Sequence, residues 1–441
     1  MTGSMSWEKL LTAERLGGGG GSAPSPARNE FQRDYDRIVF SSAFRRLHDK
    51  TQVFPMPEND HVHSRLTHSL EVSCVGRSLG VLVGAEIVNR HGLGESYSAR
   101  DFGDIVAAAC LAHDIGNPPF GHSGEDAIRN WFRDGNRRPA ADYSDAERED
   151  FVRFEGNAQG LRILTRLQMA KGRGGMRLTH ATLGAFSKYP REALLREDPG
   201  GRRSGKKHGF FQSEKGLFAE AADSLGLLRL SGKDSRWCRH PLAFLVEAAD
   251  DICYQILDLE DGFRLGKVAF DDAYDLLTAI APPGEDPRPS DGEERKSTIG
   301  YLRARTIDIL VREVAEEFLK NEREILSGGF DRSLVTVVPS KEKIDAVTDL
   351  VVRRCYRADE VLEIEIAGYE VIGALLDRFV PAALRPGRPE HEKIRVLMPA
   401  LFREEGSDYE KTLPVTDFVS GMTDSFAVSI FRRFMGIALP R

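Results

Sequence analysis

The hydrophobic residues of this chain recur with the period of an α-helix over most of its length. From Asp34 onward, the segment YDRIVFSSAFRRL repeats its apolar positions about every 3.6 residues, which is typical of an amphipathic helix. Similar patterns occupy residues 69–90, 101–114, 157–168, 241–262, 303–321, 343–380 and 423–435. Alternating strand patterns are scarce, and LVTVV at residues 334–338 is a short exception. The pattern therefore predicts an all-α protein with at most a few short strands.

Polar stretches rich in glycine and proline divide the chain. Residues 1–28 contain the run Gly17 to Gly21 followed by SAPSPAR, which buries too little apolar surface to hold a fixed shape, so we expect a flexible arm. Residues 134–150, 196–209 and 281–297 have the composition of surface loops. We expect a core at residues 29–280, a loop at 281–298, and a helical C-terminal region at 299–441 packed on the core.

The composition is that of an ordinary globular protein. With 441 residues, of which 41% are hydrophobic, the chain can bury a large core. The formal net charge of −7 argues against a surface built throughout to bind nucleic acid, although a local basic pocket is compatible with it. The five cysteines form no CxxC pair, which favours buried free thiols in a reducing compartment. No apolar run approaches a membrane span and the N-terminus lacks a signal-peptide core, so we expect a cytoplasmic protein without a membrane partner.

The candidate chemistry begins with an adjacent histidine and aspartate. His113 and Asp114 end an apolar helical stretch inside LAHDIGNPPFGHSGED, just before the chain breaks at Pro118 and Pro119. Neutral imidazole and ionised carboxylate together suit divalent ions such as Mn, Fe, Co, Ni, Zn or Mg. Adjacent polar residues can also simply cap a helix or face water, so the pair needs partners to indicate a metal site.

Two further residues can complete the site. His68 falls on the first turn of a helix, and Asp250 lies in a largely apolar helix, where a carboxylate is costly unless it is paired or bound to a cation. Taken singly, His68 can be a packed core histidine and Asp250 can form a salt bridge with Arg45 or Arg46. The joint occurrence of ligand types at His68, His113, Asp114 and Asp250 favours a metal centre over a buried polar network without metal.

A possible proton-transfer pair follows the proline turn. We expect a new helix there with Ser123 as its cap, and His122 and Glu125 stand three residues apart, close enough in a helix for a hydrogen bond. A carboxylate that orients an imidazole is typical of a general base or acid. Considered alone, the segment is equally compatible with a helix-start glutamate beside a surface histidine.

Together these residues resemble the H…HD…D ligand pattern of the HD-domain phosphohydrolases. The strings RDYDRIVFSSAFRRLHDKTQVFP, HSRLTHSLEV, AHDIGNPPFGHSGE, RFEGNAQG, KYP, EAADDICYQILDLEDG and DFVSGMTD stand in this order along the chain. They resemble the bacterial deoxyguanosine triphosphate triphosphohydrolases over most of the sequence. The resemblance implies an HD-domain helical assembly.

The resemblance also implies a reaction. A deoxynucleoside triphosphate, dGTP or another, would be hydrolysed to the deoxynucleoside and tripolyphosphate by water attack at the α-phosphorus. His68, His113, Asp114 and Asp250 would hold a divalent ion, Mn, Mg, Co, Ni or Fe. His122 and Glu125 would form the catalytic dyad, roles that agree with the chemistry of these side chains.

Further positions match the family around the substrate. By resemblance, Arg65, Lys188 and Tyr189 would reach the phosphates, and Tyr254 would stack on the sugar and leave little room for a 2′-hydroxyl. The positions that match around the sugar, base and phosphates are Gln52, Val53, Asn117, Asn157, Lys207 and Asp258. Gln52, Val53 and Asn157 can equally be structural, and we interpret the neighbouring Lys206 as a solvated charge.

The chain departs from the family at its C-terminal motif. Relatives commonly carry arginines beside DFVSGMTD, whereas this chain has Thr416 before it and Ser425 after it. The departure bears on guanine specificity and on any response to an activating dNTP. The resemblance further implies a homo-oligomer, a tetramer or hexamer, and weak single-stranded DNA binding is compatible with it. Alternatives are another HD-domain nucleotide phosphatase or phosphodiesterase, or a nucleotide sensor or single-stranded-DNA-binding protein with a structural metal.

Overall fold

The structure, a computed structural model, is all-α, as predicted. It describes residues 3–18, 28–52, 63–135, 141–169, 174–197, 200–230, 232–282, 288, 292–400, 403 and 405–438. In these ranges the extended contacts amount to isolated bridges, such as Arg191 with Arg236, and form no sheet. The possible strand at residues 334–338 was wrong. Leu334–Thr336 form a 3₁₀ turn (η5), because Leu334 is buried in the helical core and no neighbouring strand offers backbone partners.

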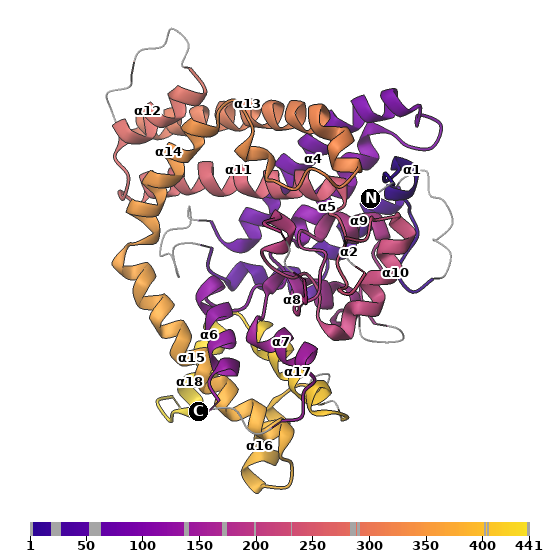
Figure 1. The fold of residues 1–441 in the computed structure, drawn as a ribbon. Helices are drawn as coiled ribbons and strands as arrows, with labels where there is room; N and C mark the ends of the chain where they lie inside the picture. Colours follow the sequence, from indigo (N-terminus) through magenta and orange to yellow (C-terminus); the bar gives the residue numbers. More distant parts are fainter. Residues whose placement is uncertain are drawn as a thin grey trace.

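The chain forms a succession of helices joined by connections of different lengths (Figure 1). In the first part of the chain they are α1 (Trp7–Leu10), α2 (Glu30–Val39), α3 (Ser42–Arg46), α4 (Arg65–His91), α5 (Ala99–Ala112), α6 (Gly121–Arg133), α7 (Asp145–Val152), α8 (Gly156–Arg162), α9 (His180–Phe186), α10 (Lys215–Leu225), α11 (Pro241–Arg264) and α12 (Phe270–Ile280). They continue with α13 (Gly292–Leu326), α14 (Lys341–Val351), α15 (Asp359–Leu384), α16 (Pro389–Leu397), α17 (Asp408–Ser420) and α18 (Asp424–Phe434). Short 3₁₀ or π turns are η1 (Leu47–Asp49), η2 (Ile163–Leu167), η3 (Arg203–Gly205), η4 (Gln212–Glu214) and η6 (Val352–Tyr356).

Helices α4 and α5 pack unusually closely because glycines line their interface. Gly76, Gly80 and Gly84 recur every four residues along one face of α4. A Cβ atom at Gly80 would lie 2.7 Å from the backbone oxygen of Phe102, and one at Gly76 would lie 2.4 Å from Cys110 Sγ. This antiparallel contact brings the C-terminal end of α5 against the N-terminal turn of α4.

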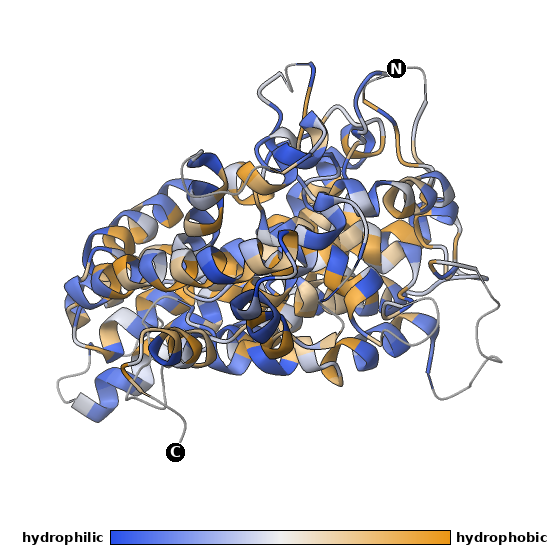
Figure 2. Cartoon of the chain, turned by 90° about the horizontal axis from the view of Figure 1, so that it is seen from below, coloured by the Kyte–Doolittle hydropathy of each residue, from blue (hydrophilic) through white to orange (hydrophobic). Residues whose placement is uncertain are grey.

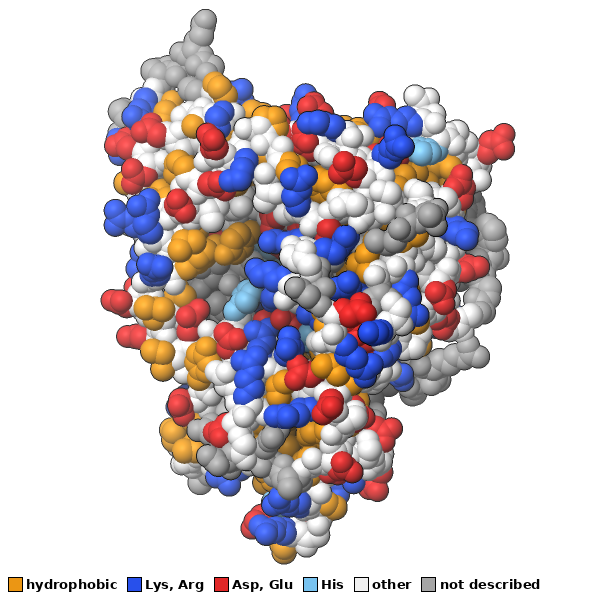
Figure 3. All heavy atoms as spheres, viewed as in Figure 1, with side chains coloured by type: hydrophobic (Ala, Val, Ile, Leu, Met, Phe, Trp, Pro, Cys, Tyr) orange, Lys and Arg blue, Asp and Glu red, His pale blue; other side chains and the backbone are white. Residues whose placement is uncertain are grey.

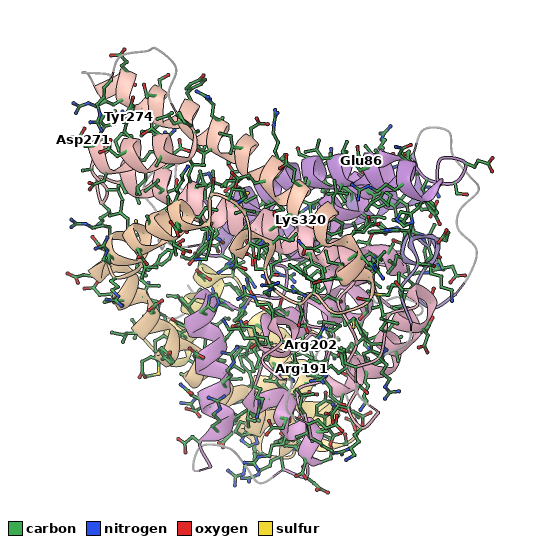
Figure 4. All side chains as sticks on the ribbon, turned by 45° about the horizontal axis from the view of Figure 1, so that its top comes forward. Glu86, Arg191, Arg202, Asp271, Tyr274 and Lys320 are labelled. Carbon is green, nitrogen blue, oxygen red and sulfur yellow. The ribbon has the colours of Figure 1, made fainter. Side chains whose placement is uncertain are left out.

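The remaining helices surround this pair in two parts. In Figure 1, α11, α12 and α13 lie with α4 in the upper part, and α15 descends to α6, α7, α17 and α18 below. Each part has its own apolar core, built around residues such as Phe102 and Leu245 above and Phe151 and Leu375 below. Figure 2 shows apolar residues interspersed with polar ones along the helices, as expected for amphipathic packing. Figure 4 places Glu86 of α4 and Asp271 of α12 at opposite ends of the upper part.

Part of the segment expected to be a flexible arm is packed into the core. Trp7 and Leu10 of α1 are buried, and the indole Nε1 of Trp7 donates to Glu322 Oε1 at 2.9 Å. Arg15 donates to the buried carboxylate of Asp34 at 2.6 Å. The expectation was therefore wrong for residues 3–18, because the apolar residues before the glycine run provide a buried face.

Two expected loops are also shorter than the composition suggested. Residues 145–150 belong to α7, which begins at a Ser144 capping box, and α13 begins at Gly292 inside the expected loop at 281–298. Polar composition there reflects exposed helix faces. In the described ranges, no helix combines the length and the apolar content needed to cross a bilayer.

Truncating α1 tests whether the N-terminal residues belong to the fold. Leu10 is fully buried, so Leu10→Ala should lower the free energy of unfolding by about 2–4 kcal/mol through lost burial and a residual cavity. Urea unfolding followed by circular dichroism measures the change, with the exposed Glu8→Ala as control. Equal stability of both variants would contradict the packed position of α1.

Candidate metal centre and active site

Three helices place the predicted metal ligands. His68 lies on the first turn of α4, which starts at a capping box formed by Ser64 and Thr67. His113 and Asp114 follow α5 directly, and Asp250 lies in the middle of α11. Because the glycine contact holds the end of α5 against the start of α4, the side chains converge although they are distant in sequence.

The convergence is close. His68, His113 and Asp114 each offer one ligand atom within 4.8 Å of the others. Asp250 Oδ1 lies 3.3 Å from His68 Nε2 and 3.5 Å from His113 Nε2, and His113 Nε2 lies 3.5 Å from an oxygen of Asp114. The structure thus brings all four predicted residues together. Asp250 pairs with these histidines and with Lys188 at 3.8 Å, and no ion pair joins it to Arg45 or Arg46 within the described ranges.

The donor set fits a divalent ion. His113 Nδ1 lies 2.7 Å from the backbone oxygen of Cys110, which assigns the proton to Nδ1 and leaves the Nε2 lone pair facing the site. Two imidazole nitrogens and two carboxylates are the ligand types that borderline divalent ions prefer. The residues present can therefore hold such an ion.

Both carboxylates are held in the ionised form. Burial alone would raise the pKa of Asp114, but Arg65, His113 and His68 outweigh it and lower the pKa to about 2. Burial would likewise raise the pKa of Asp250, and His113, His68 and Lys188 together lower it far below its ordinary value. The site therefore presents negative charge at neutral pH, as cation binding requires.

The predicted proton-transfer pair is only partly as expected. α6 begins at Gly121 after Phe120, whose φ of 62° is left-handed, so Ser123 is not the cap. His122 is exposed and Glu125 is buried. Neighbouring protein atoms displace water from around the imidazole of His122, which lowers its pKa, and the charge of Lys207 lowers the pKa further. The charge of Glu125 acts in the opposite direction.

Glu125 is already held by other donors. Its Oε1 accepts the backbone N–H of Gly156 at 2.6 Å, and its Oε2 accepts Arg129 Nη2 at 3.1 Å. Within the described ranges no hydrogen bond joins His122 to Glu125, which differs from the bond expected from their spacing. The three-residue spacing places the two side chains near each other, but it does not orient the imidazole.

The residues expected to reach the phosphates surround the metal ligands. Arg65 Nη1 donates to Asp114 Oδ2 at 2.6 Å, and Asn117 Nδ2 donates to Asp114 Oδ1 at 2.6 Å. Lys188 follows α9, and its Nζ lies 3.7 Å from the buried Glu247 and 3.8 Å from Asp250. Burial would lower the pKa of Lys188, but Glu247 and other anionic neighbours raise it, so the lysine is charged. Tyr189, next to it, is buried.

Lys207 is engaged with acidic side chains. Its Nζ lies 3.0 Å from Glu155 and 3.7 Å from Glu125, whereas Lys206 is exposed, as expected for a solvated charge. Figure 3 shows Lys and Arg side chains gathered around a hollow on this face, with a histidine at its edge. Figure 4 shows the labels of Arg191 and Arg202 close together near the centre of the view, away from Tyr274.

The predicted sugar residues lie along α11. Tyr254 is 37% exposed, and its ring centroid lies 5.6 Å from that of Tyr356. The Tyr356 hydroxyl donates to the buried carboxylate of Asp258. Tyr356, which the sequence pattern did not single out, reaches α11 because η6 interrupts the helix expected over residues 343–380.

The remaining predicted contacts are less well defined. Gln52 has a buried Oε1 without a hydrogen-bond partner within the described ranges, which leaves an acceptor available. Asn157 is half-buried on the first turn of α8. Val53 lies outside the described residues.

A lysine and an aspartate that were not predicted hold the turn between α5 and α6. Buried Lys50 donates to the backbone oxygens of Asn117, at 2.5 Å, and Ser420, at 2.9 Å. Asp424 accepts the backbone N–H groups of Thr51 at 3.0 Å and Phe120 at 3.1 Å. The motif DFVSGMTD therefore supports the active-site turn. Its flanking Thr416 is buried, and Ser425 donates to Asp49.

Comparison with known proteins agrees with this arrangement. The HD domain family model matches residues 65–153, and the phosphohydrolase-associated domain matches residues 338–433. The chain is 47% identical to a deoxyguanosinetriphosphate triphosphohydrolase-like protein of Synechocystis sp., over 99% of this chain and 100% of that protein. It is 43% identical to a protein of the same description from Pseudomonas aeruginosa, over 99% and 100%. A deoxyguanosinetriphosphate triphosphohydrolase of Yersinia enterocolitica is 31% identical, over 93% and 96%.

The carboxyl group of Asp258 should make stability depend on pH. Burial raises its pKa to about 7, with Asp261 adding to the shift and the Tyr356 hydroxyl opposing it. An unfolded aspartate has a pKa of about 3.9, so the folded state binds this proton more tightly and loses stability as the pH rises from about 4 to about 7. Asp258→Asn removes this loss, so the variant should gain stability relative to the unsubstituted protein more at pH 8 than at pH 5. Melting curves at the two pH values measure the difference, and an equal effect at both would contradict the shifted pKa.

Proposed function

The chain belongs to the family of deoxyguanosinetriphosphate triphosphohydrolase-like proteins, which are HD-domain phosphohydrolases, and we propose that it hydrolyses deoxynucleoside triphosphates to the deoxynucleoside and tripolyphosphate. The observation that carries the proposal is the convergence of His68, His113, Asp114 and Asp250 on one point. The cationic Arg65 and Lys188 lie beside the two carboxylates. The names of the relatives supply the substrate class.

The four ligands would hold a divalent ion, with Mn, Mg, Co, Ni and Fe as the candidates. Such an ion supplies Lewis acidity toward a phosphoryl oxygen and neutralises charge that develops at the α-phosphorus. Asp114 and Asp250 contribute two negative charges to its binding, and the Cys110 carbonyl fixes the tautomer of His113 that leaves Nε2 free.

His122, assisted by Glu125, would accept and donate the protons of the reaction. Water adds to the α-phosphorus, the bond from phosphorus to the 5′ oxygen breaks, and that oxygen leaves with the deoxynucleoside after gaining a proton. The lowered pKa of His122 keeps its imidazole neutral at neutral pH and able to accept a proton. The charge of Glu125 stabilises the imidazolium that forms.

Cationic and polar side chains would orient the triphosphate. Arg65 already contacts Asp114 and would bring its guanidinium charge to the phosphates beside the metal ligands. Lys188 and Tyr189 approach from the segment after α9, and Asn117 from the turn after α5. Asn157 would contribute from the side of Glu125.

The sugar and base would lie against α11. The half-exposed ring of Tyr254 offers a stacking surface, and Asp258 offers a carboxylate oxygen beside it. A ring in that position disfavours a 2′-hydroxyl, which would select deoxynucleotides. Gln52 and Val53 would complete the pocket, with the unpartnered Gln52 Oε1 as an acceptor.

The remaining parts of the proposal rest on the sequence and on family resemblance. These are a cytoplasmic location, assembly into a tetramer or hexamer, activation by a second dNTP and weak binding of single-stranded DNA. Thr416 and Ser425 flank DFVSGMTD where relatives commonly carry arginines, and neither side chain can contact a phosphate as an arginine does. Activation by a second dNTP is therefore the property in which this chain would differ most from its relatives.

Product analysis tests the reaction. Incubation with each of the four dNTPs and Mn²⁺, singly and in pairs, should yield tripolyphosphate and deoxynucleoside in equal amounts. Pairs are included because an enzyme that needs an activating nucleotide is inactive with one dNTP alone. Formation of pyrophosphate or phosphate in place of tripolyphosphate would assign the chain to another HD-domain reaction.

The control for this experiment is His122→Ala. It should lower turnover by about 10²–10⁴-fold, as expected for loss of a general acid or base, and leave nucleotide binding intact. Full activity in this variant would remove His122 from the mechanism.

Removal of one ligand tests the metal centre. His113→Ala should weaken Mn²⁺ binding at least tenfold, because it removes one of the two imidazole donors, and isothermal titration calorimetry measures the affinity. Lys206→Ala, an exposed change, serves as the control. Unchanged Mn²⁺ affinity in His113→Ala would show that the ion binds elsewhere.

A further inference from the structure

Four ionisable side chains form a cluster near His122, and one of them, Arg129, also contacts Asp126 at 2.9 Å. The cluster consists of Glu125 and Arg129 of α6, Glu155 before α8, and Lys207 after η3, and we call it the Glu155 cluster. Arg129 Nη2 lies 2.9 Å from Glu155 Oε1 and 3.1 Å from Glu125 Oε2. Lys207 Nζ lies 3.0 Å from Glu155 Oε2 and 3.7 Å from Glu125 Oε2. Each cation therefore contacts both carboxylates, and each makes its shorter contact with Glu155.

We propose that Glu155 is a positioning residue of the active site, which anchors Arg129 and Lys207 so that both cations stay beside one oxygen of Glu125. The proposal rests on the proposed function, because it acts through Glu125 on His122. It also changes the expected role of Lys207, which becomes a support for Glu125 in place of a phosphate ligand.

The backbone next to Glu155 serves the same carboxylate. Gly156 N–H donates to Glu125 Oε1 at 2.6 Å, so Oε1 is fixed by the backbone and Oε2 by the two cations. A Cβ atom at Gly156 would lie 2.8 Å from Glu125 Oε1 and 2.4 Å from Asn117 Oδ1, so a glycine is needed for this approach. Arg129 is further fixed by its Nε, which donates to the backbone oxygen of Phe154 at 2.6 Å.

The electrostatics of the cluster show why a second carboxylate matters. Burial would raise the pKa of Glu125, but Lys207, His122 and Arg129 lower it. The opposite holds for Glu155, whose pKa is raised to about 7 by burial and by the charge of Glu125. Glu155 thus carries the unfavourable part of the pairing, while its two oxygens hold Arg129 and Lys207 in place.

Substitutions of Glu155 and of Lys207 should affect the pH profile differently. Because the pKa of Glu155 is raised to about 7 and that of His122 is lowered, Glu155 is largely uncharged where His122 titrates. Glu155→Gln should therefore leave the limb of the kcat profile governed by His122 in place. Lys207→Met removes a positive charge and should move the same limb to higher pH. In Glu155→Gln kcat should fall about 10- to 100-fold, as for other outer-shell partners, with KM nearly unchanged.

The experiment measures kcat and KM for a hydrolysed dNTP from pH 5 to pH 9, with melting temperature and Mn²⁺ affinity for each variant. Glu149→Gln is the matched control, because Glu149 pairs with Arg153 at the surface of α7 and the same charge is removed six residues away. Its profile should stay unchanged. The variant that combines Glu155→Gln with Lys207→Met should lose less kcat than the product of the losses in the two single variants, because the two side chains act together.

Several results would overturn the proposal. Glu155→Gln with unchanged kcat would do so, as would a fall in kcat that the loss of folded protein at the assay temperature accounts for in full. If Glu155→Gln does not fold, Lys207→Met decides: a large rise in KM without a shift would mark Lys207 as a phosphate ligand. Absence of dNTP hydrolysis by the unsubstituted protein would instead overturn the proposed function, on which the inference depends.

Discussion

Buried charge at the meeting point of α4, α5 and α11 is the constraint on which the other features depend. Two carboxylates and two imidazoles converge there. Burying such groups away from water costs free energy unless a cation lies beside them. The glycines at positions 76, 80 and 84 allow α5 to lie directly on α4, which puts His113 within reach of His68. Arg65, Lys188 and Glu247 then balance the local charge. The apolar packing of the helices and the polar centre are consequently one arrangement.

The C-terminal helices are part of this arrangement although they carry no predicted metal ligand. Lys50 joins the turn after α5 to the end of α17, and Asp424 at the start of α18 holds both Thr51 and Phe120. Asp417, fully enclosed, receives Arg162, which also contacts Glu214. The phosphohydrolase-associated domain thus fixes the geometry of the turn that presents His122. A change in α17 or α18 would reach the active site through these contacts.

Much of the fold and of the metal centre could be predicted from the sequence, because helical periodicity places apolar residues on one face and makes ionisable residues on that face stand out. Asp250 and the His113–Asp114 pair stood out as ionisable groups in apolar helices, and the structure brings them together. Packing of residues 3–18 could not be predicted, since their few apolar residues depend on a groove formed by distant segments. The partners of Glu125 were missed for a similar reason. Glu155 and Lys207 meet it only through the fold, whereas Arg129, four residues later on α6, was a local signal. Tyr356 depended on the π turn η6, which continuous periodicity conceals.

The central claim is that one divalent ion is bound by side chains of α4, α5 and α11. Anomalous diffraction from crystals of the protein grown with Mn²⁺, collected at the manganese edge, tests it most directly. We predict one strong peak at about 2.0–2.3 Å from His68 Nε2, His113 Nε2 and one oxygen each of Asp114 and Asp250. A peak bound by other residues, or no peak at saturating Mn²⁺, would contradict the account.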